Sequence, residues 1–178
     1  MENNDPKTQA EVKDPIGVLG WPEEKGRDGE RTPMQWDARL HAGFSRVTPW
    51  LPVPAKGPKR SVGVERADPS SILNLYKRLL ALRRWHDALR SGTYVPLLPN
   101  DPNVLAYLRR TKDSAVLVAL NMSTSIPTLR NVLAGQDLKS TTGRVLVGTL
   151  LPANRVVPLD ALTLRPFEVV IADVGPGR

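Results

Sequence analysis

The distribution of proline and glycine constrains this chain more than any other feature of its sequence. Residues 1–69 hold 9 of the 17 prolines and 7 of the 13 glycines. With so many residues that interrupt helices and strands, the apolar residues follow neither the 3.6-residue period of a helix nor the 2-residue period of a strand. We therefore predict an ordered loop region here. For residues 1–12, which are polar and lack aromatic side chains, disorder is the alternative.

Three of the four tryptophans fall within this loop region, at Trp21, Trp36 and Trp50. An aromatic side chain buries roughly 150–250 Å² when it packs, so these indoles and Phe44 carry much apolar surface. A loop of this length is uncommon inside a self-contained domain. We expect the region to pack on a structure outside this sequence.

A helix is predicted over residues 69–92. Asp68 is suited to be its N-cap, Pro69 its first residue and Gly92 a left-handed C-terminal cap. At 100° per residue, one half of the helix surface is apolar and needs a large partner, so association through exposed apolar surface is a possible consequence. That half comprises Ile72, Leu73, Leu75, Tyr76, Leu79, Leu80 and Leu82. Arg83 projects among them and is expected to pair with a carboxylate, to cap carbonyls or to cover apolar surface with its stem.

From residue 93 onward the pattern changes to short segments rich in β-branched and aromatic residues, divided by turn signals. We predict strands at 94–98, 104–110, 115–122, 126–132, 144–150 and 167–172. Regular short strands without intervening helices indicate an antiparallel β-sandwich of about seven or eight strands. Its core is expected to include Val116, Val118 and Leu120, which alternate along one strand.

Composition excludes several classes of protein. The chain has no cysteine, which rules out disulfide scaffolds and thiolate sites, and its two histidines, His41 and His86, are too few for a multi-histidine metal centre. We expect no metal and no cofactor. No apolar run approaches the ~20 residues that span a bilayer, and the first nine residues lack a secretory core, so a cytoplasmic protein without membrane contact is expected.

The net charge of +7 invites a nucleic-acid interpretation, and its location argues against one. Residues 1–69 are neutral, residues 70–92 carry +4 and residues 93–178 carry +3. The excess is concentrated on the predicted helix, and basic outer faces are common on ordinary helices. Nucleic acid is therefore not an expected partner.

The run GRDGERTPMQW at residues 26–36 carries the most chemistry. It is a loop that presents two arginines, two carboxylates and one indole. Guanidinium groups bind hydroxyls and carboxylates in fixed geometry, and indole faces stack on apolar ring surfaces, so this mixture suits sugar recognition. Charged aromatic loops also serve as structural braces.

Together with AGF at 42–44 and WLP at 50–52, this run resembles the late part of α-glucosidases and oligo-1,6-glucosidases of the α-amylase superfamily, glycoside hydrolase family thirteen. Residues 71–89 resemble the last barrel helix of these enzymes, and residues 104–107 and 116–123 resemble their C-terminal β-sandwich. The resemblance extends from about Asp14 to Val174. It implies a mainly β chain in two parts: residues 1–92, a remnant of the β/α barrel domain made of a catalytic-face loop and the last helix, and residues 93–178, an antiparallel β-sandwich.

The resemblance also implies which residues act. In the family, the nucleophilic aspartate, the acid/base glutamate and a stabilising aspartate lie on earlier barrel strands, so this chain is expected to hold no catalytic residue. Glu23, Glu24, Asp28 and Glu30 are expected to be solvated or paired with Lys25, Arg27 and Arg31. Arg27 is the first candidate to contact a terminal glucosyl unit, and Arg31 and Asp28 are candidate neighbours or braces.

Two functions follow from these observations. The first is the C-terminal portion of an α-glucosidase that hydrolyses terminal α-linked glucose from short oligosaccharides and is inactive without the barrel. The alternative is a non-catalytic protein that binds carbohydrate or docks on a partner. The reading frame upstream of Met1 separates them, because only the first function requires barrel strands there.

Overall fold

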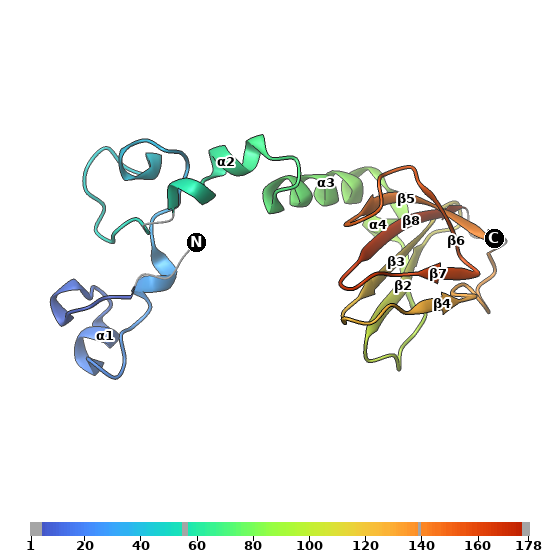
Figure 1. Cartoon of the computed structure of the whole chain (residues 1–178), viewed down its shortest axis with the longest axis horizontal. Helices are drawn as coiled ribbons and strands as arrows, with labels where there is room; N and C mark the ends of the chain where they lie inside the picture. The colour runs from blue at the N-terminus through green and yellow to red at the C-terminus, as the bar shows by residue number, and fades with distance from the viewer. Residues whose placement is uncertain (1–4, 55–56, 139, 176–178) are drawn as a thin grey trace. The chain divides into compact units, whose positions relative to one another are not determined.

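The computed structural model describes residues 5–54, 57–138 and 140–175 (Figure 1). The chain forms two compact units, Met1–Tyr76 and Lys77–Arg178, and the division lies within the longest helix, α3 (Ile72–Trp85). Among the described residues, no helix is both long and apolar enough to cross a membrane.

The first unit is a loop region with short helical turns, in which the described residues form no strand. Its elements are η1 (Gln9–Glu11), α1 (Pro15–Gly20), η2 (Asp28–Arg31), η3 (Leu40–Gly43), η4 (Gly57–Arg60) and α2 (Val62–Ala67). The sequence prediction of a loop did not include the helices α1 and α2, which have six residues each. Both begin with a side-chain cap: Asp14 accepts a hydrogen bond from the Ile16 amide, and Ser61 accepts one from the Val64 amide. Residues 5–12 contain η1 and bury Val12, while residues 1–4 lie outside the described part.

The predicted helix over 69–92 is correct in place and wrong in its ends. Ser71, not Asp68, caps α3, because its Oγ accepts from the Asn74 amide at 3.1 Å, whereas the Asp68 carboxylate accepts from Ser70. The helix stops at Trp85, and α4 (Asp87–Ser91) follows after the extended residue His86. Arg83 caps a carbonyl, as one of the predicted alternatives had it: its Nη1 donates to the Leu89 oxygen at 3.1 Å.

Gly92 is not the left-handed cap that the sequence predicted, since its φ is −65°. Position 92 requires glycine for a different reason, the lack of space for a side chain. A Cβ atom at this position would lie 2.4 Å from the Ala88 carbonyl oxygen and 2.9 Å from the Arg110 amide nitrogen. The end of α4 and the end of β2 therefore approach more closely than any side chain permits.

The second unit contains the sheets, and every strand pair in it is antiparallel. The six-stranded sheet has the order β1 (Thr93–Pro96), β2 (Val104–Arg110), β3 (Ala115–Asn121), β8 (Val169–Gly175), β5 (Thr142–Gly148) and β6 (Val156–Pro158). A second sheet pairs β4 (Thr128–Arg130) with β7 (Ala161–Thr163). The antiparallel β architecture is confirmed. The prediction missed β6 and β7, which have only three residues each.

The core explains why β3 is apolar from Ala115 to Leu120. On one face of the large sheet, Leu117 and Ala119 pack in a buried cluster that includes Leu129 of β4 and Leu162 of β7. On the other face, Val116 and Val118 form a second cluster with Ala88, Leu82 and Leu79 of the helices. A strand covered on both faces loses the apolar–polar alternation.

This arrangement corrects one expectation. Val116, Val118 and Leu120 do share a face, but that face lies against the helical residues, and the main core takes their neighbours.

Large apolar side chains remain exposed in the first unit and along α3. In the loop region Trp36, Phe44 and Trp50 are 49%, 50% and 67% exposed. On α3, Ile72, Tyr76 and Leu80 are each more than half exposed. The predicted apolar face is thus only partly covered, with Leu79 and Leu82 packed against the second cluster.

Candidate functional site

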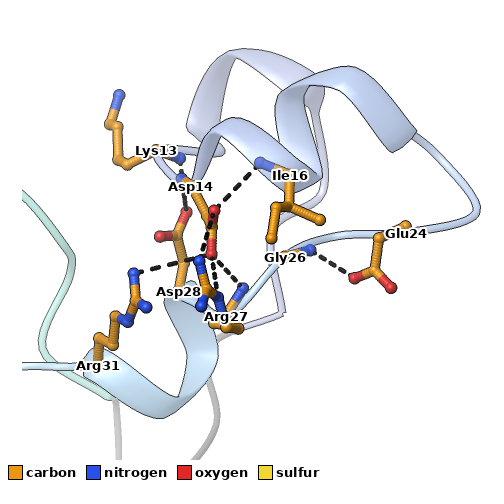
Figure 2. Close-up of polar contacts among 8 residues, drawn as sticks. All are labelled: Lys13, Asp14, Ile16, Glu24, Gly26, Arg27, Asp28 and Arg31. Carbon is orange, nitrogen blue, oxygen red and sulfur yellow. Dashed lines mark hydrogen bonds and ion pairs between the residues drawn. The ribbon is translucent and has the colours of Figure 1, made fainter.

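The loop at residues 26–36, called the motif loop below, is anchored by the buried carboxylate of Asp14 (Figure 2). Asp14 precedes Pro15, and its Oδ1 accepts a hydrogen bond from the Ile16 amide at 3.1 Å, which starts α1. Its other oxygen faces the loop. The same side chain therefore caps a helix and anchors the following loop.

Arg27 makes the main contact with this anchor. Its backbone amide and its Nε both donate to Asp14 Oδ2, at 3.0 and 2.9 Å. Arg31 approaches the same oxygen, with its Nη1 at 3.7 Å. The hydrogen bond from the Arg27 guanidinium, followed by that from the Ile16 amide, holds the pKa of the Asp14 carboxyl well below its ordinary value.

The two arginines are nevertheless available to a ligand. The side chain of Arg27 is 51% exposed and that of Arg31 is 47% exposed, whereas that of Asp14 is fully buried. One end of the Arg27 guanidinium is thus fixed while half of the side chain faces solvent. A guanidinium oriented in this way can donate to hydroxyl or carboxylate oxygens with little loss of freedom.

Asp28 is placed differently from the prediction. It is 1% exposed, and its Oδ2 accepts from the backbone amides of Lys13 and Asp14. Among the described residues, its Oδ1 is buried without a hydrogen-bond partner. Asp28 is therefore neither solvated nor paired with a basic side chain, because it turns inward at the start of η2 and ties this turn to the segment before α1 (Figure 2).

Two glycines allow the anchor and the loop to approach each other. A Cβ atom on Gly17 of α1 would lie 2.4 Å from the Lys25 carbonyl oxygen, and one on Gly26 would lie 2.8 Å from the Cβ of Asp14. Gly26 also has a φ of +71°, which favours glycine. Backbone therefore packs directly on backbone just before Arg27, the residue that precedes η2.

The other carboxylates in and just before the loop do not form an acid–base pair with Asp28. Glu23, Glu24 and Glu30 are exposed, and Glu24 accepts from the Gly26 amide at 2.8 Å. In the described part of the chain, no group of three histidine, aspartate or glutamate side chains could hold a metal ion.

A tight turn over residues 36–43 begins at the end of the motif loop. The amides of Trp36 and Asp37 both donate to the Ala42 carbonyl oxygen, at 2.8 and 3.2 Å. Ala42 and Gly43 have positive φ angles, and a Cβ on Gly43 would lie 2.6 Å from the Asp37 carboxylate. Non-glycine residues in this conformation often mark functional loops. The turn leaves the Trp36 side chain half exposed.

The sequence prediction grouped Arg27, Arg31 and Asp28. In the structure, Arg27 and Arg31 approach the Asp14 carboxylate, whereas Asp28 accepts from the backbone amide of Asp14. The prediction did not identify Asp14. The signal for it was the Asp14-Pro15 dipeptide, which is typical of a helix start.

The sequence of this chain is similar to those of known proteins. The family described as "Alpha amylase, catalytic domain" matches residues 2–92. An oligo-1,6-glucosidase of Parageobacillus thermoglucosidasius is 39% identical over 156 residues, which are 88% of this chain and 27% of that enzyme. A probable α-glucosidase of Rhizobium meliloti is 40% identical over 113 residues, 64% of this chain and 20% of that protein.

Solved structures give the same result. The trehalose-6-phosphate hydrolase of Bacillus licheniformis matches 94% of this chain and 31% of its own, with 28% identity and a TM-score of 0.70. An isomaltulose synthase of Klebsiella matches 83% of this chain and 26% of its own, with 29% identity and a TM-score of 0.68. This chain thus spans about a fifth to a quarter of the length of the curated relatives it matches. With its family match over half of its length and the motif loop anchored within that half, the chain belongs to the α-amylase family.

Proposed function

We propose that this chain forms the C-terminal part of an α-glucosidase that hydrolyses terminal α-linked glucose from short oligosaccharides with retention of configuration. Residues 1–92 would complete the barrel domain with a catalytic-face loop and the last helix, and residues 93–178 would form an antiparallel β-sandwich. The names of the relatives support the α-glucoside substrate. A cytoplasmic location is part of the proposal.

The anchored guanidinium of Arg27 is the observation that carries this proposal. Arg27 is fixed by Asp14 and 51% of its side chain is exposed, so an oriented guanidinium is open to a ligand. We assign it to donate hydrogen bonds to hydroxyls of the terminal glucosyl unit. Arg31 stands beside it as a second donor, and Asp28 positions the turn that carries both.

The chemistry of bond cleavage is assigned to carboxylates outside this chain. A retaining glycosidase needs a nucleophile and an acid about 5–5.5 Å apart on a rigid frame. The exposed Glu23, Glu24 and Glu30 and the buried Asp28 do not share one environment. The role of this chain is therefore to bind and orient substrate, which contributes to the rate only where the carboxylates are in place.

A hybrid enzyme tests this role. In the Parageobacillus oligo-1,6-glucosidase, the 156 aligned residues would be replaced by those of this chain. We expect Arg27→Ala to lower kcat/KM for a chromogenic α-glucoside by about tenfold to a hundredfold, the effect of losing one charge-assisted hydrogen bond. Arg46→Ala changes an exposed arginine outside the motif loop and serves as the matched control. Equal kcat/KM in the two variants would refute the role of Arg27.

Exposed apolar surface favours a second candidate function, a non-catalytic chain that docks on a partner. Trp36, Phe44 and Trp50 are about half exposed or more. Burial of such side chains stabilises a complex by roughly 1.5–3 kcal/mol each. A hybrid that folds and binds sugar but cleaves none would favour this candidate over the α-glucosidase.

A further inference from the structure

Trp85 is the most exposed aromatic side chain among the described residues of the second unit. It ends α3, and 79% of its surface is exposed. The guanidinium of Arg84 lies over its ring, 5.3 Å from the centroid. Trp85 belongs to neither of the buried clusters of this unit, so its indole is open to a ligand.

Trp85 borders a hollow of about 490 Å³ between the end of α3, α4 and the turn that joins β2 to β3. This volume is within the ~300–1,000 Å³ range of small-molecule sites. Besides Trp85, the hollow is lined by His86, Asp87, Arg90, Ser91, Thr111, Asp113 and Ser114. One aromatic platform thus stands beside a set of side chains that are all polar.

Hydrogen bonds hold several of these polar groups in place. Asp87 Oδ1 accepts from Arg90 Nη2 at 2.6 Å, and Ser91 Oγ donates to the Asp87 carbonyl oxygen at 3.2 Å. His86 Nδ1 lies 3.4 Å from Ser114 Oγ, and both residues line the hollow. The Thr111 amide donates to the Ser114 carbonyl oxygen at 2.8 Å, which closes the turn. A site with ordered polar groups binds at a smaller entropic cost.

We propose that this hollow is a second carbohydrate-binding site, with Trp85 as the surface on which a pyranose ring stacks. The hollow contains two carboxylates and one guanidinium, which disfavours phosphates and other anions. Carboxylates, hydroxyls and a guanidinium together accept from and donate to the hydroxyls of a neutral sugar. The choice of α-linked gluco-oligosaccharides among sugars rests on the proposed function. None of the lining residues belongs to the loop of Arg27.

Binding of maltotriose and isomaltotriose to the 178-residue chain tests the site. In ¹H–¹⁵N NMR spectra, each of the four tryptophans gives one indole signal, and we expect the Trp85 signal to shift on addition of either sugar. Trp85→Ala should weaken the affinity of this site about tenfold, a factor that corresponds to about 1.4 kcal/mol. Because Trp85 is exposed, the variant should keep the unfolding midpoint of the parent.

Phe167→Ala is the matched control, since Phe167 is 63% exposed in the same unit and does not line the hollow. Asp87→Asn supplies a second variant that disturbs the polar side, and it too should weaken binding. A Trp85 signal that stays fixed at saturating sugar would overturn the site, as would Trp85→Ala binding with the affinity of the parent. Equal binding of cellotriose would overturn the assignment to α-linked sugars.

The outcome is separable from that of the proposed function. An inactive hybrid enzyme with intact binding at Trp85 would refute only the α-glucosidase role. An active hybrid without binding at Trp85 would refute only this second site.

Discussion

The close approach of α1 to the motif loop predicts that Gly17 tolerates no side chain. In Gly17→Ala, the new Cβ would lie 2.4 Å from the Lys25 carbonyl oxygen, 2.5 Å from its carbonyl carbon and 2.8 Å from the Gly26 nitrogen. Ordinary contacts of a Cβ begin near 3.4 Å. The backbone at residues 25 and 26 must therefore move by about 1 Å, because carbonyl groups of the main chain cannot rotate away as a side chain can.

Gly17→Ala is therefore expected to lower both the stability of the chain and kcat/KM of the hybrid enzyme. Overpacking of this kind costs about 1–3 kcal/mol, which outweighs the gain of about 1 kcal/mol that alanine brings to a helix in place of glycine. The displacement also moves Arg27 away from Asp14, a contact now at 2.9 Å. Misplacement of a substrate-binding group by ~1 Å can lower kcat/KM by about a hundredfold.

Gly63→Ala provides a matched control with the opposite sign. Gly63 also lies in a six-residue helix of the first unit, but its Cβ would meet no atom closer than 3.4 Å. We expect urea unfolding to show a loss of stability for Gly17→Ala and no loss, or a gain of up to about 1 kcal/mol, for Gly63→Ala. In the hybrid enzyme, only Gly17→Ala should lower kcat/KM. Equal effects of the two substitutions would refute the close-approach argument.

Three further predictions concern the core, the Asp14 anchor and the contact between α4 and β2. Leu162→Ala should destabilise the chain by about 2–5 kcal/mol in urea unfolding, whereas Leu105→Ala, 45% exposed, should cost much less. The low pKa of Asp14 gives stability that is complete above about pH 4 and is lost as the pH falls toward the folded-state pKa, so the protection factor of the Arg27 amide in hydrogen exchange should fall in acid. Asp14→Asn should lower that protection factor already at neutral pH and remove its dependence on acid. Gly92→Ala should lower the unfolding midpoint, because its Cβ would collide with backbone of both α4 and β2.

The sequence located the strands that are long and continuous. The segment 104–110 was predicted with its observed ends, and 115–122 differs from β3 by one residue. Both are rich in apolar residues and end at turn signals, so local pattern was sufficient. Strands of three residues, such as β6 and β7, carry too little pattern to stand out. The positive φ of Phe167 explains why the last strand begins two residues later than predicted.

Long-range contacts account for what the sequence did not reveal. The anchor Asp14 lies 13 residues before Arg27, and no local period links the two. In the same way, alternation in β3 assigned Val116 and Val118 to one face, but only the packing of the helices shows which cluster that face joins. The motif loop was identified by resemblance, and its anchoring by Asp14 and Asp28 required the structure.

The most direct test of the central proposal compares turnover of p-nitrophenyl α-D-glucoside by the isolated 178-residue chain and by the hybrid enzyme. The account predicts hydrolysis by the hybrid and none by the isolated chain, because an acid and a nucleophile in fixed register are worth many orders of magnitude in rate. Turnover by the isolated chain that disappears on changing Glu23, Glu24, Asp28 or Glu30 to its amide would contradict the assignment of catalysis to carboxylates outside this chain.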